Sequence, residues 1–216
     1  MSTPKTPREV RFSKLGPRVV QALKSRFFEA WYYDDPAEAV NFIVTLIPKD
    51  HLVSWGGSMT AVSLGLQVRL EKEGYRLLDR DKAADQQERT ERMRQALTCD
   101  TFLAGSNAIT EDGQLVNIDM MGNRVAAMCF GPRQVIVVAG MNKVVKTLDN
   151  AVVRARTIAS PTNVQRFAGT KTPCMETGSC ADCNSPDSIC SYIVTTRRCC
   201  PSGRIKVVLI GKDLGF

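Results

Sequence analysis

The sequence predicts an α/β fold with a mostly parallel sheet and helices on both of its faces. Apolar runs typical of strands alternate along the chain with stretches of helical periodicity, and this alternation favours a parallel sheet. One run, residues 134–139, is almost entirely Val and Ile, as in a strand buried on both faces. With 216 residues the chain is long enough for one such domain with a buried core. We therefore expect a single domain over residues 1–216.

The composition is that of an ordinary globular protein, 44% hydrophobic and 24% charged. No apolar run is long enough to cross a membrane, and residues 1–7 lack the apolar core of a secretory signal. We therefore expect a cytoplasmic protein without a membrane partner. The formal net charge is +7, but the basic residues are dispersed among acidic ones, as in residues 88–94. This pattern favours a small anionic metabolite as the ligand over a nucleic-acid partner.

The first part of the chain predicts two helices after a short tail. Residues 1–14 are polar and contain proline, so we expect a loose N-terminal arm. Residues 17–31 have apolar side chains on one helical face and begin with a proline, which suits a first turn. Residues 37–47 should form a second helix, with Asp35 as its N-cap. We interpret both helices as packing elements.

A Gly-Gly turn then joins a predicted strand, residues 51–53, to a predicted helix, residues 59–73. Glycine lets the backbone approach a ligand closely, and the start of a helix offers unpaired N–H groups and a partial positive charge. Such a turn suits a phosphate or a carboxylate. The candidate ligand-binding residues here are Gly56, Gly57, Ser58 and Thr60. The alternative is a tight turn with nothing bound.

The remaining elements continue the alternation to the end of the chain. A short strand, a charged helix and a strand lead to a hairpin turn at Asp112-Gly113 and a returning strand. An apolar helix, the Val/Ile strand, two further helices and a last strand follow. In order, these elements are expected at residues 75–78, 85–97, 101–105, 114–118, 123–130, 134–139, 148–158, 160–167 and 205–210.

Further polar residues follow the predicted strands, at the edge where ligands of parallel sheets gather. Asn107 follows one strand, and Asn123 and Arg124 follow another. An arginine can bind a carboxylate or phosphate with two parallel hydrogen bonds, although a salt bridge to Asp119 is the alternative for Arg124. Lys143 follows the Val/Ile strand and can reach the same anion, or can lie solvated in a loop. All four are candidate ligand-binding or site residues.

Six of the eight cysteines lie between residues 174 and 200, in a segment with little apolar area. In a reducing compartment clustered cysteines bind metal more often than they form disulfides. We expect a cysteine-rich, metal-binding insertion at residues 170–203, before the last strand, with disulfides or free thiols as alternatives. Thiolates suit zinc or a 4Fe–4S iron–sulfur cluster, and the spacing does not choose between them. The candidate metal ligands are Cys174, Cys180, Cys183 and Cys190.

Several of these stretches together resemble one known family. They are Ser54-Trp55-Gly56-Gly57-Ser58-Met59-Thr60, the run from Gly105-Ser106-Asn107 through Gly140-Met141-Asn142-Lys143, and Gly211-Lys212-Asp213-Leu214-Gly215-Phe216. They resemble the LUD-domain proteins of lactate utilization, formerly DUF162, over roughly residues 10–216. The cysteine segment is similar to that of stand-alone members from anaerobic bacteria. The resemblance implies a fold similar to the NagB/RpiA/CoA-transferase group.

The resemblance also implies a chemistry. The family takes part in oxidation of lactate to pyruvate by complexes with iron–sulfur partners, which favours the iron–sulfur cluster over zinc and an electron-transfer protein as partner. A homo-oligomer is also compatible with it. Isomerases of the methylthioribose-phosphate type carry a catalytic Asp where Asn107 stands, and an amide cannot act as a general acid or base. CoA transferases use a glutamate nucleophile, so Glu111, together with Asp119, is a candidate catalytic residue.

Two hypotheses follow from the sequence. In the first, this is an iron–sulfur LUD-domain protein of anaerobic lactate, hydroxy-acid or redox metabolism that binds a small anion. It lacks flavin and nicotinamide fingerprints, so it would act as one component of a lactate-oxidising system. In the second, it is a zinc-stabilised regulatory module that binds a metabolite or CoA ester without catalysis.

Overall fold

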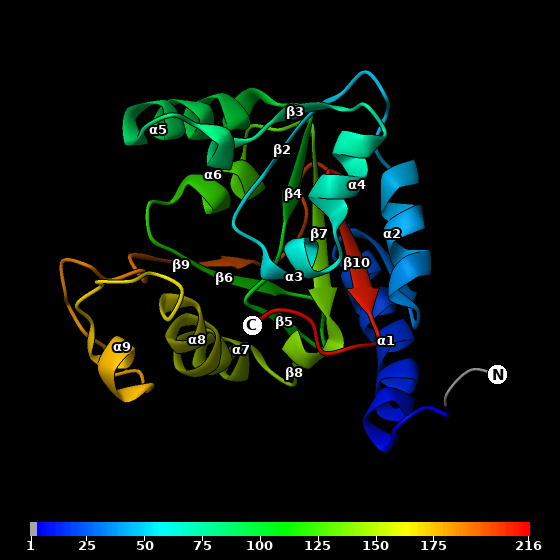
Figure 1. Ribbon diagram of the computed structural model, residues 1–216. Helices are drawn as coiled ribbons and strands as arrows, with labels where there is room; N and C mark the ends of the chain where they lie inside the picture. The colour runs from blue at the N-terminus through cyan, green and yellow to red at the C-terminus, as the bar shows by residue number, and fades with distance from the viewer. Residues whose placement is uncertain (1–3) are drawn as a thin grey trace.

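Six parallel strands form the central sheet of the molecule, whose structure is a computed structural model that describes residues 4–216 (Figure 1). The strand order is β1-β10-β7-β4-β2-β3, and every neighbouring pair is parallel. The strands are β1 (Glu29–Tyr33), β2 (Leu52–Trp55), β3 (Arg76–Leu78), β4 (Thr101–Ala104), β7 (Gln134–Gly140) and β10 (Ile205–Ile210). The predicted α/β fold with a parallel sheet is therefore confirmed.

Helices cover both faces of this sheet because strand side chains alternate between two cores. Val135 and Val137 of β7 pack in the core under α1, whereas Ile136 and Val138 pack in the core on the other face. The first core is closed by α1 (Pro7–Ser25) and α6 (Asn123–Cys129). The second is closed by α2 (Pro36–Thr45), α3 (Met59–Ser63) and α4 (Leu66–Lys72). This arrangement explains why β7 has no polar face in the sequence.

A second, four-stranded sheet lies beyond the carboxyl ends of the central strands (Figure 1). Its order is β8-β5-β6-β9, with β5 (Ala108–Thr110), β6 (Leu115–Asp119), β8 (Val144–Val145) and β9 (Tyr192–Thr196). The predicted hairpin turn at Asp112-Gly113 is confirmed, and Gly113 has a φ of 88°. The strand that enters this turn is β5, however, because the chain leaves the central sheet after β4. Short helices α7 (Leu148–Arg154) and α8 (Ser160–Val164) and the outlying α9 (Pro173–Thr177) lie beside this second sheet.

The N-terminal prediction was wrong in two respects. Residues 7–14 of the expected loose arm belong to α1, because Thr6 caps the helix and exchanges hydrogen bonds with Glu9 in a capping box. Residues 1–3 lie outside the described residues. The helix ends at Ser25, and Trp31, which suggested its continuation, belongs to β1, the edge strand of the central sheet. Tryptophan and tyrosine fit a pleated surface as well as a helix face, so their periodicity was ambiguous.

Two other helices differ from expectation. The helix predicted at residues 59–73 is broken at Gly65, which has a φ of 65°, into α3 and α4. The helix predicted at residues 148–158 contains a π-helical turn, Ala155–Ala159, between α7 and α8. The charged helix α5 (Gln86–Gln95) was expected and is present. None of the helices in residues 4–216 combines the length and apolar character that a membrane span requires.

Phe102 offers a test of where the core lies. Phe102 of β4 is only 1% exposed in the core on the α1 and α6 face of the sheet, so Phe102→Ala should lower the free energy of unfolding by about 3–5 kcal/mol through lost burial and a residual cavity. Phe130→Ala is the matched control, because Phe130 is 86% exposed and its removal should change stability by no more than about 0.5 kcal/mol. Urea unfolding of both variants measures the difference; equal losses would contradict this placement of the core.

Candidate functional site

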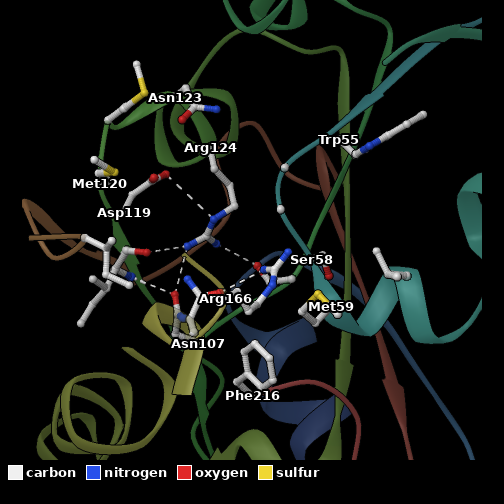
Figure 2. A pocket seen from close by; sticks show the side chains of 18 of the residues that line it. Trp55, Ser58, Met59, Asn107, Asp119, Met120, Asn123, Arg124, Arg166 and Phe216 are labelled. Atoms are coloured by element: carbon white, nitrogen blue, oxygen red, sulfur yellow. Dashed lines mark hydrogen bonds and ion pairs between the residues drawn. The ribbon is translucent and has the colours of Figure 1, made fainter. Parts of the chain in front are cut away.

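A cavity of about 470 Å³ lies at the carboxyl ends of β2 and β4, between the central and the second sheet. The Gly-Gly turn before α3, the segment after β4, and the connection from β6 to α6 form much of its wall (Figure 2). Its charged lining residues are Arg80, Asp81, Arg89, Asp119, Arg124, Lys143 and Arg166. The cavity is therefore lined by five basic and two acidic side chains, and it lies at the sheet edge where ligands of such folds gather.

Arg124 is held in place by the protein itself. Its Nη1 donates to the carbonyl oxygen of Gly105 at 3.1 Å and to Oδ1 of Asn117 at 2.6 Å. Its Nη2 donates to Oδ1 of Asn107 at 3.0 Å and to the carbonyl oxygen of Ile118 at 2.7 Å. Figure 2 shows the guanidinium at the centre of this network. Four of its N–H groups are thus committed, so Arg124 contributes a fixed charge to the cavity rather than a free pair of donors.

The two glycines of the turn make room for arginines. A Cβ on Gly56 would lie 2.7 Å from Cδ of Arg124, and a Cβ on Gly57 would lie 3.1 Å from Nη2 of Arg80. Ser58 caps the five-residue helix α3 by accepting a hydrogen bond from the N–H of Ala61. The turn lines the cavity as the sequence suggested, but its small residues are needed for the packing of guanidinium groups.

The other polar candidates also meet at this wall. Asn107 uses Oδ1 to accept from the N–H of Ile118 and from Arg124. Asp119 accepts from the N–H of Val125 at 3.0 Å and lies 3.9 Å from Nε of Arg124, so the salt bridge considered as an alternative is present as a long contact. Asn123 lines the cavity at the start of α6. The structure thus brings together candidates from three separate stretches of sequence.

Lys143 is a buried cationic side chain with a single hydrogen bond in the part of the chain that the structure describes. The residue is 5% exposed, and its Nζ donates to Oγ1 of Thr60 at 3.1 Å. It forms no ion pair within residues 4–216. Burial, aided by the positive charges of Arg154 and Arg124, lowers the pKa of Lys143 to about 7. Thr60 does not line the cavity itself but holds this amine.

Sequence reasoning did not single out three of the cationic residues: Arg80, Arg89 and Arg166. Arg80 follows β3, so the rule that predicted the other strand-end residues also applied to it. Its side chain is 16% exposed, and within the described chain its Nε is buried without a hydrogen-bond partner. Arg166 follows α8, and which way it faces depends on how that helix packs, which no local pattern gives.

Glu111, a candidate catalytic residue, lies away from this cavity. It pairs with Lys146 at 2.8 Å and lines a shallow depression beside α1 together with Arg11, Lys14 and Arg18. The carboxylate of Asp119 is therefore the one of the two catalytic candidates that lies at the cavity.

The cysteine segment is less regular than the rest of the chain, but it is not without structure. It contains α9, none of whose residues is buried, and β9, which pairs with β6 and was not expected. All eight cysteines are free thiols. Burial raises the pKa of the Cys190 thiol, and the neighbouring thiols of Cys180, Cys174 and Cys183 raise it further. Among residues 4–216, however, no three His, Cys, Asp or Glu side chains are arranged to hold a metal ion.

The comparisons with known proteins give the family. The model of the LUD domain matches residues 17–210. The chain belongs to the LUD-domain family. The match spans both sheets and the cavity between them, so the family's shared domain includes the candidate site of this LUD-domain protein. No curated protein matches the chain.

Three solved structures are similar to this chain to different extents. A DUF162 family protein from Deinococcus radiodurans has a TM-score of 0.54 at 14% identity, over 96% of this chain and 99% of the other. This likeness shows a shared fold. The eIF2B delta subunit from Chaetomium thermophilum is similar over 50% of this chain and 48% of the other, with TM-score 0.33 and 18% identity. Ribose 5-phosphate isomerase A from Neisseria gonorrhoeae is similar over 52% and 54%, with TM-score 0.34 and 12% identity.

Lys143→Met should change how the free energy of unfolding depends on pH. The folded protein lowers the pKa of this amine from 10.5 to about 7, so the unfolded chain binds the proton more strongly between these values. Stability of the wild type should therefore rise with pH through this window, by on the order of a few kcal/mol. The methionine variant lacks this contribution, and it should be the more stable protein near about pH 6 and lose that advantage by about pH 10.

Urea unfolding at a series of pH values measures this effect. Lys146→Met is the control, because the Lys146 side chain is 71% exposed and its loss should alter stability by only about 0.5 kcal/mol. The same pH dependence in wild type and Lys143→Met would show that Lys143 is not buried as described.

Proposed function

We propose that this LUD-domain protein binds a small anionic metabolite in the cavity, and that the metabolite is a 2-hydroxy acid or its oxidised form. The main observation in support of the proposal is the excess of positive charge around Lys143, because five basic and only two acidic side chains line the cavity. A cavity of about 470 Å³ suits a small molecule. Membership of the family named for lactate utilization favours a hydroxy acid over other anions.

The two acidic residues do not cancel this positive charge. Asp81 pairs with Arg89 at 2.7 Å and lies 3.9 Å from Arg80, and Asp119 is engaged by the start of α6 and by Arg124. Arg166 donates to Oδ1 of Asn163 at 3.1 Å and forms no ion pair among the described residues. Lys143 and Arg166 are therefore available to a bound carboxylate, with Arg124 as a fixed charge behind it.

The cysteine segment supports a second part of the proposal, that Cys174, Cys180, Cys183 and Cys190 hold a 4Fe–4S cluster. The donor set fits: these four thiols are free and lie within residues 174–190, and three of them influence the fourth electrostatically. Among the described residues these thiols are not arranged to hold a metal ion, so binding would require them to move together and would stabilise α9, none of whose residues is buried. A bound cluster would supply one-electron chemistry, with an electron-transfer protein as its partner.

Zinc in the same thiols is the alternative. The protein would then be a metabolite- or CoA-ester-binding regulatory module without catalysis. Asp119 is the candidate catalytic carboxylate at the cavity, but it already accepts a hydrogen bond from α6. The metal content and the ligand range together distinguish the two functions.

Arg166→Gln tests the anion site. Isothermal titration with lactate and with pyruvate should show binding to the wild type, and the variant should bind roughly tenfold more weakly, because a charge-assisted hydrogen bond contributes about 1.5 kcal/mol. Arg94→Gln is the matched control, since Arg94 is 72% exposed on α5, pairs with Glu91 and does not line the cavity. If neither acid binds, the hydroxy-acid proposal fails; binding of acetyl-CoA alone would favour the regulatory module.

Protein purified without oxygen should contain about four irons and four sulfides per chain. Cys183→Ser should lower both contents and the visible absorbance. Cys129→Ser is the control, because Cys129 is an exposed thiol on α6, outside the cysteine segment. One zinc per chain without colour would overturn the cluster and support the alternative, and no metal at all would overturn both.

A further inference from the structure

The amine of Lys143 is buried near two other cationic side chains, which is an unfavourable place for a positive charge. It stands at the end of the short turn Met141–Lys143, directly after β7, and lines the cavity. The charged groups that influence it are Arg154 of α7 and Arg124 of α6, and both are cations. Arg154 is itself fixed by donating to the carbonyl oxygens of Asn142 and Asn107. This environment favours the neutral form of the amine.

The hydrogen bond to Thr60 leaves the reactive face of this amine free. The hydroxyl of Thr60 donates to the carbonyl oxygen of Leu214 at 3.3 Å, so its oxygen accepts from Nζ of Lys143 at 3.1 Å. The nitrogen acts as donor in that contact, and its lone pair is not used by it. A desolvated lysine beside other cationic groups is one of the known ways to make an amine nucleophilic. With a pKa of about 7, a large fraction of Lys143 is neutral near neutral pH.

We propose that Lys143 forms an imine with the carbonyl carbon of a small 2-oxo acid whose carboxylate lies against the cationic wall of the cavity. This inference rests on the proposed anion site and names the chemical class of its ligand. A ketone without a carboxylate would lack the charge interaction, and a 2-hydroxy acid would bind without reacting because it has no ketone carbon for the amine to attack.

The reaction balances without an oxidant or a reductant. The lone pair of Nζ attacks the carbonyl carbon, the C=O π electrons move to oxygen, and a proton from the amine neutralises that oxygen to give a carbinolamine. The second amine proton leaves with this oxygen as water when the C=N bond forms. Hydrolysis reverses the sequence. Arg124 and Arg166 would stabilise the carboxylate throughout, while the buried position of Lys143 limits the access of water to the imine and slows its hydrolysis.

Trapping with cyanoborohydride tests the proposal. The reagent delivers hydride to the carbon of the N-protonated imine and leaves a stable secondary amine. Wild-type protein incubated with pyruvate and cyanoborohydride should gain the mass of one reduced adduct, and peptide mapping should place it on Lys143. Lys143→Arg should lose the adduct, whereas Lys146→Arg, which changes an exposed lysine nearby in the chain, should retain it. Excess lactate should protect Lys143 by occupying the same cavity.

Parallel titration of pyruvate without reductant separates this inference from the anion site. Binding without any adduct on Lys143, or adducts distributed only over exposed lysines, would overturn the imine and leave the anion site standing. No binding and no adduct would overturn both. If Lys143→Arg fails to fold, the peptide map of the wild type and its protection by lactate still decide the question.

Discussion

The buried guanidinium of Arg124 is the interaction on which the rest of the site depends. A charge removed from water costs several kcal/mol unless its donors find partners, and here the acceptors come from the end of β4, from Asn107 before β5 and from β6. The same charge therefore joins the central sheet to the second sheet. Gly56 must lack a side chain for this arginine to fit. The charge of Arg124 is fixed before any ligand arrives, which reduces the reorganisation needed on binding.

This arrangement changes the physical interpretation of the Gly-Gly turn. Its composition suggested that backbone N–H groups at a helix start would hold an anion. In the structure α3 is only five residues long, Ser58 caps it, and the space beside both glycines is filled by Arg124 and Arg80. The electropositive character of the cavity thus comes mainly from side chains of distant elements. The site remained at the predicted edge of the sheet, but the groups that create it are different.

The sequence was informative where a residue's environment follows from its own neighbours. The apolar run of β7 indicated a buried parallel strand, and Asn107, Arg124 and Lys143, which follow strands, line one cavity. Periodicity failed at β1, where an aromatic residue suits either helix or strand, and at β9, whose Tyr-Ile-Val run was interpreted as part of the irregular cysteine segment although it pairs with β6. It also could not place Glu111, because β5 turns away from the cavity into a hairpin. Those outcomes depend on contacts between segments distant in sequence.

The π-helical turn at Ala155–Ala159 has a consequence for comparing members of the family. A π turn holds one more residue than an α turn, so the side chains after it are out of angular phase with those before it. Arg154 precedes the turn and supports Lys143, while Asn163 and Arg166 follow it and line the cavity. A relative that lacked a single residue here would keep every one of these side chains in its sequence and yet present a different set to the ligand. Sequence identity at Arg166 therefore implies the same site only where the length of this turn is also preserved.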